Sequence, residues 1–302
     1  MTSPDRRRRS PARAGLAAAL FALTCALAAQ AQAQSPAGAC TVTPVAGEAR
    51  QLTSGDRARG YRLFVPASGA RSGALSLVLD LHGTGGDAAT RAKNSAFEAL
   101  AAREGFAVAT LQAEDARWNV PVATWRADDV RYVADVIDDI AARTCIDPAR
   151  IYATGFSGGG RMSSLLGCRL NDRIAAIAPV GGLRWPGPCP GRAVPVLTVH
   201  GLADTTNPYE GHADRGAEWV ESVPEALAGW AAHNRCQPKI EQDRQPGPLQ
   251  TLRYPGCEAE VRLLRIDGMG HVWPKTEVDA TDAAWRFFQA HPMRPTRRGD
   301  TP

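Results

Sequence analysis

The chain has 302 residues, of which 44% are hydrophobic and 22% are charged, a length sufficient for one large α/β domain with a sizeable core. The formal net charge of +4 comes entirely from residues 1–33, and without them the chain carries 30 basic and 30 acidic residues. This neutral balance excludes the electrostatic signature of a protein that binds nucleic acid or an anionic membrane surface.

Residues 1–33 have the pattern of a secretory signal peptide. The basic stretch RRRRSPAR precedes an apolar run, AGLAAALFALTCALAA, and then the small residues AQA. The apolar run is too short to be a comfortable membrane span. We expect cleavage after Ala33, with Ala31 as the second choice; lipid attachment at Cys25 is the weaker alternative, because Thr24 is a poor neighbour for that reaction. The protein is therefore expected to be secreted, to the periplasm or outside the cell.

Apolar, β-branched runs alternate with helix-like segments along the rest of the chain. The expected strands cover 61–65, 75–82, 106–112, 150–155, 174–182, 194–201 and 261–267. The expected helices cover 89–104, 126–143, 157–169, 224–235 and 279–290. This alternation predicts an α/β fold with a mostly parallel, doubly wound sheet and helices on both faces. Residues 34–292 are expected to form one domain, and residues 293–302 a loose tail.

A single serine, Ser157, lies among glycines where an expected strand gives way to an expected helix. Gly155, Ser157 and Gly159 match G-x-S-x-G, the nucleophile elbow. Glycines on both sides allow neighbouring backbone to pass close to a strained serine whose hydroxyl points outward. The start of the helix behind it favours negative charge beside the serine. The motif is weak alone, but its strand–turn–helix setting makes Ser157 the candidate nucleophile.

The partners of such a serine follow it in the required order, first an acid and then a histidine. Asp204 comes after the expected strand 194–201, and His271 follows the last expected strand in a glycine-rich turn. Asp267 is the rival acid, but it belongs to the same strand end as His271. We expect His271 to take the serine proton and return it to the leaving group, and Asp204 to fix the tautomer of His271. Activity should therefore fall in acid, where His271 is protonated.

An oxyanion hole needs two backbone N–H groups near the serine. The stretch LHGTGG ends an early strand where such a loop is expected, and Gly158 follows the nucleophile. Thr84 is the expected first donor, with Gly83 as the alternative, and Gly158 is the second donor.

Three residues are candidates for binding substrate: Trp273, His82 and Tyr209. Trp273 is two residues from His271, although Trp125, Trp185 and Trp273 are all candidates for the core as well. His82 and His200 each precede a glycine at a strand end, and both are interpreted as fixing loops rather than as catalytic groups.

Six cysteines remain after the signal peptide, an even number that suggests disulfides in an exported protein. Helices end and strands begin at one edge of a parallel sheet, so Cys236 and Cys257 should be neighbours there. The same edge should join Cys168 to Cys189. Cys40 and Cys145 are then paired by elimination, although Cys145 could replace Cys189 as the partner of Cys168. The sequence has no CxxC pair and no His/Cys cluster, so we expect no metal site and no cofactor.

Six stretches between residues 60 and 290 carry a resemblance to a known family. They are LHGTGG, DDVRYV, RIYATGFSGGGRMS, AAIAPVGG, HGLADTTNPYEG and GMGHVWP. In this order they resemble the secreted esterases that group bacterial polyhydroxybutyrate depolymerases with feruloyl and acetylxylan esterases. The resemblance implies an α/β-hydrolase fold and a serine carboxylesterase with Ser157, Asp204 and His271 as catalytic residues.

The resemblance implies hydrolysis of feruloyl, aryl or short-chain acyl esters of plant cell-wall polysaccharide, or of related soluble esters. Hydrolysis of polyhydroxyalkanoate oligomers is the alternative, but depolymerases of insoluble polyester usually add a linker and a polymer-binding domain that this sequence lacks. A secreted serine peptidase and a catalytically dead binding protein are the remaining alternatives. We expect a monomer that acts on small or oligomeric esters.

Overall fold

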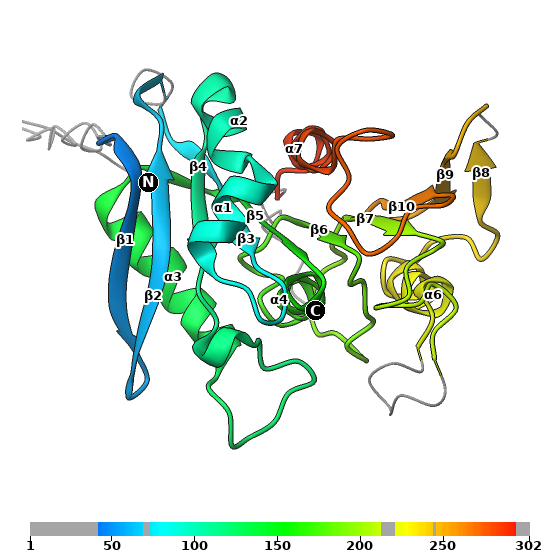
Figure 1. Cartoon of the computed structure of the whole chain (residues 1–302), viewed down its shortest axis with the longest axis horizontal. Coiled ribbons are helices and arrows are strands. Elements are labelled where there is room, and N and C mark those ends of the chain that lie inside the picture. The colour runs from blue at the N-terminus through cyan, green and yellow to red at the C-terminus, as the bar shows by residue number, and fades with distance from the viewer. Residues whose placement is uncertain (1–41, 69–72, 213–220, 244–245, 294–302) are drawn as a thin grey trace, which may run out of the picture. The chain divides into compact units, whose positions relative to one another are not determined.

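The computed structural model describes residues 42–68, 73–212, 221–243 and 246–293 (Figure 1). The chain divides into units 1–38 and 39–302, and every described residue belongs to the second. The predicted signal peptide, Cys40 and all but the first residue of the predicted tail lie outside the described residues. In the part of the chain that is described, no helix has the length and apolar character needed to cross a bilayer.

The described strands form one ten-stranded sheet in the order β1-β2-β4-β3-β5-β6-β7-β10-β9-β8. Six central strands pair in parallel: β4 (Ala107–Leu111), β3 (Leu75–Leu81), β5 (Ile146–Phe156), β6 (Ala176–Val180), β7 (Val196–Gly201) and β10 (Val261–Ile266). The outer strands pair in an antiparallel manner: β1 (Val45–Ser54), β2 (Arg57–Val65), β8 (Glu241–Asp243) and β9 (Leu249–Tyr254). The predicted mostly parallel sheet is confirmed, whereas β1, β8 and β9 were not predicted.

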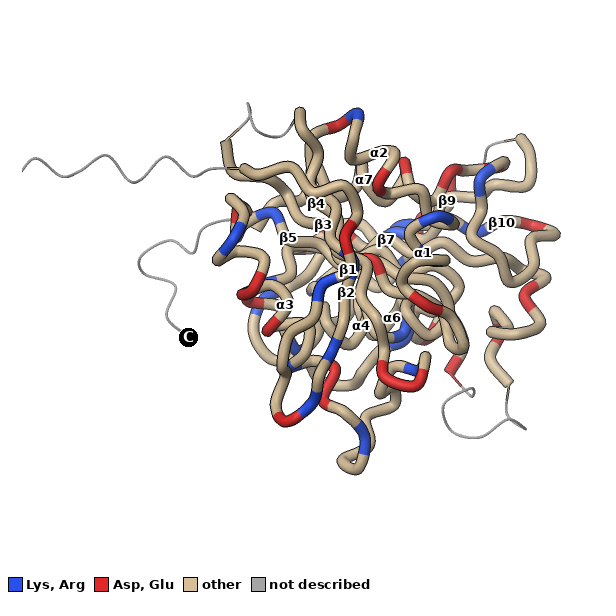
Figure 2. Tube along the Cα trace, turned by 60° about the vertical axis from the view of Figure 1, so that its left-hand side comes forward, with Lys and Arg blue, Asp and Glu red and all other residues tan. Residues whose placement is uncertain are grey.

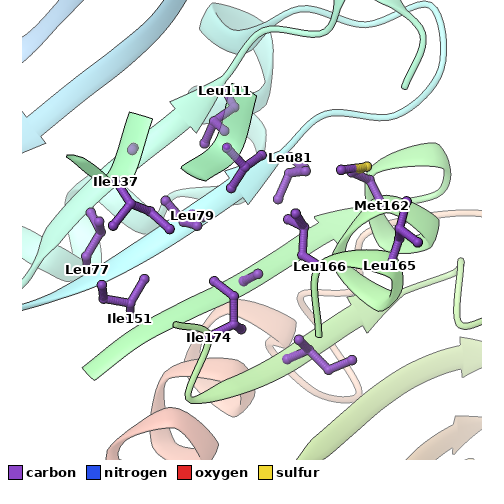
Figure 3. Close-up of a cluster of buried hydrophobic side chains, with 14 of the residues drawn as sticks. Leu77, Leu79, Leu81, Leu111, Ile137, Ile151, Met162, Leu165, Leu166 and Ile174 are labelled. Carbon is purple, nitrogen blue, oxygen red and sulfur yellow. The ribbon is translucent and has the colours of Figure 1, made fainter. Parts of the chain in front are cut away.

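Helices cover both faces of this sheet (Figure 1). One face packs against α3 (Asp129–Arg143), α4 (Gly158–Arg169) and α6 (Val223–His233), and the other against α2 (Phe97–Glu104) and α7 (Ala280–Ala290). Figure 3 shows the first of these layers, in which Leu77, Leu79 and Leu81 of β3 lie among side chains of α3 and α4. All seven residues of β3 are buried, as expected for a strand covered on both faces.

The helix predicted over 89–104 is two helices, α1 (Ala88–Ser95) and α2. Ala96 between them has φ 58° and ψ 19°, the left-handed conformation, which ends one helix and redirects the chain into the next. Alanine favours helix interiors, so its identity gave no signal of this break. The helix predicted over 126–143 begins at Asp129, because the Asp128 carboxylate accepts the N–H of Arg131 and caps it.

Two disulfides lie where helices end and strands begin. One joins Cys168 to Cys189, and the other joins Cys236 to Cys257. Both are pairs that the sequence predicts, and both lie at the edge of the sheet opposite the C-terminal strand ends. Cys145 is buried, and its predicted partner, Cys40, is outside the described residues.

Basic and acidic residues are interspersed along the described chain in the view of Figure 2. Two oppositely charged pairs are buried: Arg59 with Asp129, and Arg91 with Asp80, each at 2.6 Å. The Asp80–Arg91 pair joins the central strand β3 to α1, next to the C-terminal end of the sheet.

Candidate active site

Ser157 lies in a sharp turn between β5 and α4. Its backbone has φ 55° and ψ −115°, which L-residues rarely adopt, and its N–H donates to the carbonyl of Val180 at 2.9 Å. A Cβ at Gly155 would lie 2.5 Å from the backbone of Gly159, and one at Gly159 would lie 2.2 Å from the Leu81 carbonyl oxygen. Both flanking glycines of the motif are therefore required by close backbone approach.

Asp204 and His271 are brought together from the ends of β7 and β10. His271 Nδ1 lies 2.7 Å from Asp204 Oδ2, while Oδ1 accepts the N–H groups of Thr206 at 2.9 Å and Asn207 at 2.7 Å. Because Asp204 is an acceptor, Nδ1 carries the proton, and the neutral imidazole presents Nε2 as a proton acceptor. Burial raises the pKa of Asp204, but the hydrogen bonds from His271 and Asn207 outweigh burial and hold that pKa below its usual range.

Ser157 and His271 line one cavity, of about 420 Å³. We call it the Ser157 cavity. Phe156, Trp118 and Val120 supply its apolar wall, and the Phe156 ring lies 4.7 Å from the His271 ring, centre to centre. A serine and a histidine–aspartate pair thus meet at one concave site, as nucleophilic catalysis requires.

The predicted oxyanion donors, Thr84 and Gly158, line the same cavity. Gly158 is the first residue of α4, so its N–H has no carbonyl one turn earlier to bond. A Cβ at Gly158 would lie 3.1 Å from the Thr84 nitrogen, so the backbones of the two residues approach closely. In the described loop, the N–H groups of Gly85 and Gly86 already donate to backbone carbonyls, at 2.8 and 3.0 Å. This geometry favours Thr84 over Gly85 and Gly86 as the donor from the loop.

The two histidines interpreted as loop-fixing are both buried. His82 Nε2 accepts the N–H of Ala113 at 3.0 Å, and its Nδ1 lies 2.8 Å from the carbonyl of Gly83. His200 Nε2 lies 2.8 Å from the carbonyl of Asn207. Burial lowers the pKa of both imidazoles, so they stay neutral inside the fold. Both ring nitrogens of His82 are engaged, so its hydrogen bonds support the loop, while the residue also lines the second cavity, next to Trp273.

The other predicted residues divide between pocket and core. Trp273 lines a second cavity next to His271, described below. Tyr209 does not line either cavity: it is 5% exposed, and its ring packs 5.9 Å from that of His200, so its assignment to substrate binding is corrected. The rival acid, Asp267, is exposed and accepts a hydrogen bond from Gln250 at 3.1 Å.

Two other tryptophans were also candidates for the core. Trp185 packs against the buried Trp230, with ring centres 5.2 Å apart. Trp125 is 80% exposed, so its assignment to the core is wrong. It lies in the loop between β4 and α3, which begins at Asp129.

Sequence reasoning missed Asn207, a residue that is 1% exposed and holds the acid in place. Its side-chain oxygen accepts a hydrogen bond from Arg161 Nη2 at 2.7 Å, and its side-chain nitrogen donates to the carbonyl of Gly181. A Cβ at Gly181 would lie 3.4 Å from His271 Cε1, so this backbone borders the imidazole. Arg161 lies four residues after Ser157, one turn along α4, and that spacing was the only available signal.

The described residues include no group of three or more His, Cys, Asp or Glu side chains that could hold a metal ion. The side chains at Ser157 support acid–base and nucleophilic chemistry.

Comparisons with known sequences agree with this geometry. Residues 59–187 match the family described as "Esterase PHB depolymerase". NocK of Nocardia uniformis subsp. tsuyamanensis, to which an esterase activity is ascribed, is 30% identical over 254 residues, which cover 75% of this chain and 74% of that protein. Feruloyl esterase B of Piromyces equi is 32% identical over 221 residues, which cover 66% of this chain and 40% of that protein.

Solved structures share the fold at low sequence identity. The acetyl xylan esterase from Aspergillus awamori superposes with a TM-score of 0.59 at 15% identity, over 80% of this chain and 99% of that one. A thermostable esterase superposes with a TM-score of 0.56 at 16% identity, over 82% of this chain and 63% of that one. The predicted α/β-hydrolase fold is confirmed.

Proposed function

The chain belongs to the family of PHB depolymerases and feruloyl esterases and is a carboxylesterase, and from this premise we propose that it works through an acyl-enzyme on Ser157. One observation carries the proposal. The strained serine shares a cavity with His271, whose Nδ1 is hydrogen-bonded to Asp204 Oδ2 at 2.7 Å.

In the proposed first step, Ser157 Oγ attacks the ester carbonyl carbon while its proton passes to His271 Nε2. The carbonyl oxygen becomes an oxyanion, which the N–H groups of Thr84 and Gly158 stabilise. The C–O bond to the alcohol then breaks, and His271 returns the proton to the departing oxygen. Water repeats the sequence on the acyl-enzyme, so the products are one carboxylic acid and one alcohol.

Asp204 acts in this scheme without taking up the proton. Its lowered pKa keeps it a carboxylate, and its bond to Nδ1 stabilises the imidazolium that forms in each half-reaction. The hydrogen bonds from the N–H groups of Thr206 and Asn207 hold the Asp204 carboxylate in the orientation that faces His271.

The proposed substrates are feruloyl or other aryl esters, or short-chain acyl esters, of plant cell-wall polysaccharide or related soluble compounds. The aromatic and apolar wall formed by Phe156, Trp118 and Val120 supports an aryl or small acyl group beside Ser157. The Piromyces equi relative is named a feruloyl esterase, which also supports an aryl ester as the substrate. Oligomers of hydroxyalkanoic acid are the second candidate, which the description of the matched family favours.

We also propose that the protein is secreted after loss of residues 1–33. The disulfides Cys168–Cys189 and Cys236–Cys257 support this proposal, because such bonds persist in oxidising compartments.

The experiment that tests the function uses purified residues 34–302 and the same chain with Ser157→Ala. Methyl ferulate, acetylated xylan and hydroxybutyrate oligomers are offered side by side, with peptide anilides as the comparison. The wild type should release acid from ferulate or acetate esters, and Ser157→Ala should not. Cleavage of anilides without ester hydrolysis, or a loss of activity with EDTA that zinc restores, would overturn the proposal.

A further inference from the structure

A second cavity, of about 520 Å³, adjoins the Ser157 cavity. The two share Thr84, Phe156 and His271. The rest of the wall comes from three segments: the loop 82–87, α1 through Thr90, Arg91 and Asn94, and the segment directly after His271 through Val272, Trp273 and Lys275. We propose that this second cavity, the alcohol cavity, binds the leaving alcohol of the ester and is built for a hydroxyl-rich alcohol such as a sugar. The inference rests on the proposed function and assigns the two halves of its substrate.

The stereochemistry of the attacked carbon decides which half enters which cavity. Besides Ser157 Oγ, that carbon carries the oxyanion, the alcohol oxygen and the acyl chain. The oxyanion must face the N–H groups of Thr84 and Gly158, and the alcohol oxygen must lie within hydrogen-bond reach of His271, which protonates it. His271 borders both cavities, but the residues that follow it line only the second cavity, whereas Ser157 and Gly158 line only the first. We therefore assign the alcohol to the second cavity and the acyl chain to the Ser157 cavity.

The polar groups of the alcohol cavity suit hydroxyls. Thr90 and Asn94 lie four residues apart on α1 and so share one face of the helix, and both are exposed. Asn94 offers both amide donors and an amide acceptor, and Lys275 offers three N–H donors. Thr90 Oγ1 donates to Asp87 at 2.8 Å, which leaves its oxygen lone pairs as acceptors. An alkyl alcohol could use none of these groups.

Trp273 gives the alcohol cavity an apolar wall, and contacts with neighbouring residues hold its ring in place. The Arg91 guanidinium lies 3.8 Å over its ring, and its Nε1 donates to Thr281 Oγ1 at 3.0 Å. Arg91 is itself fixed by the buried Asp80 of β3. With its only donor engaged, Trp273 offers C–H and ring surface, which suits the apolar face of a sugar ring.

The Ser157 cavity contrasts with this arrangement, since Trp118 and Val120 line it together with Arg117 and Arg161, and among the described residues no amide or lysine side chain lines it. The apolar surface of Trp118 and Val120 favours a flat aryl acid over a polyol. The difference in lining between the two cavities therefore agrees with the stereochemical assignment.

The test compares two esters of one acid, a methyl ester and an arabinose ester, and measures the ratio of their kcat/KM values. The acid is whichever of ferulate, acetate or 3-hydroxybutyrate the wild type hydrolyses fastest. The ratio should favour the sugar ester in the wild type. It should fall about threefold to tenfold in Asn94→Ala and in Lys275→Ala, as expected for one lost hydrogen bond each.

Two control variants make the comparison specific. Lys93→Ala changes an exposed residue of α1 that does not line the cavity, and it should leave both rates unchanged. Val120→Ala alters the Ser157 cavity, so it should change the preference among acids but not the sugar-to-methyl ratio. An unchanged ratio in Asn94→Ala and Lys275→Ala, or an equal change in Val120→Ala, would overturn the assignment.

A binding measurement separates this inference from the mechanism. Calorimetry on Ser157→Ala compares the affinity for the arabinose ester with that for the methyl ester, with and without Asn94→Ala. The sugar ester should bind more tightly, and Asn94→Ala should reduce that advantage by the same factor. Equal affinities would refute the alcohol cavity even if catalysis proceeds through Ser157, whereas failure of the acyl-enzyme would leave this difference in affinity intact.

Discussion

The backbone N–H of Asn207 donates to Oδ1 of Asp204 at 2.7 Å, so the other carboxylate oxygen, Oδ2, is left to face His271. The Asn207 side chain ties this turn to α4 through Arg161 and to the end of β6 through Gly181. The acid is thus held by a residue that joins three segments far apart in the sequence.

Replacement of this residue should misplace the acid. In Asn207→Ala the backbone bond to Asp204 can remain, but the turn loses its side-chain links, so we expect kcat to fall about tenfold with KM little changed. Loss of the buried polar contacts should also lower the free energy of unfolding by about 1–3 kcal/mol. Steady-state kinetics and thermal melts measure the two effects.

Asn234→Ala is the matched control for this prediction. Asn234 is also a fully buried asparagine that donates to two backbone carbonyls, at 2.7 and 3.0 Å, but far from the candidate site. It should lower stability by a similar amount and leave kcat of the folded protein unchanged. Equal losses of kcat in the two variants would show that Asn207 acts only through stability.

The choice between two acids can be tested directly. Asp204→Asn should reduce kcat by about a thousandfold or more, because an amide can hold the wrong tautomer of His271 and cannot stabilise the imidazolium. Asp267→Asn removes only an exposed acceptor for Gln250, and activity should stay within about twofold, since surface substitutions have small effects. A reversal of these two results would assign the acid to Asp267.

The backbone strain at Ser157 should lower the melting temperature of the protein. Both Ser157→Ala and Ser157→Gly should abolish ester hydrolysis, because neither can form the acyl-enzyme. Only glycine relieves the positive φ of 55°, which should be worth about 1 kcal/mol or more. The glycine variant should then melt roughly 2–4 °C above the alanine variant. Equal melting temperatures would mean that the turn stores no such strain.

Acid should destabilise the fold through two buried histidines. Burial lowers the pKa of His82 and His200, so between their folded and unfolded pKa values the unfolded chain binds more protons. The free energy of unfolding should therefore fall as the pH drops through the ordinary histidine pKa of about 6.5, by up to about 1.4 kcal/mol per pH unit for each group. Thermal melts from pH 8 to pH 5 measure this slope. His200→Asn should be less stable at pH 8 but show a shallower decline; an unchanged slope would exclude His200 as a cause.

The disulfides should affect stability rather than turnover. The bond Cys236–Cys257 closes a separation of 21 residues, worth about 3 kcal/mol in the chain-entropy account. The double variant Cys236→Ser/Cys257→Ser should melt at a lower temperature and keep its initial rate in the cold, because the bond lies at the sheet edge away from Ser157. Non-reducing peptide mapping checks the pairing, and a peptide that links Cys236 to any other cysteine would contradict it.

The central sheet and the candidate catalytic residues were predictable because their signals are local. Buried parallel strands are continuous apolar runs, and G-x-S-x-G records a backbone constraint, seen here as the close approach of Gly159 to Leu81. Asp204 and His271 could be chosen because strand ends gather at one edge of the sheet. Neither choice needed any knowledge of distant contacts.

The features that were missed depend on such contacts. Ala96 breaks a helix through its backbone conformation, which its side chain does not encode. The edge strand β8 (241–243) is short and largely exposed, so it has no apolar pattern. The Asn207 side chain works through single hydrogen bonds to Arg161 and Gly181, which lie in two distant segments. The position of Arg161 one turn after Ser157 was the only local signal, and it did not identify Asn207 as the partner.

The wall formed by Trp273 and α1 also has a consequence for the synthesis of esters by this protein. If the proposed acyl-enzyme and alcohol cavity both hold, departure of the first alcohol leaves the acyl-enzyme next to a cavity that accepts another alcohol. An added sugar that occupies this space would compete with water for the acyl group, and the protein would then make a new ester instead of a free acid. In a solvent poor in water, transesterification onto sugars should become its main reaction.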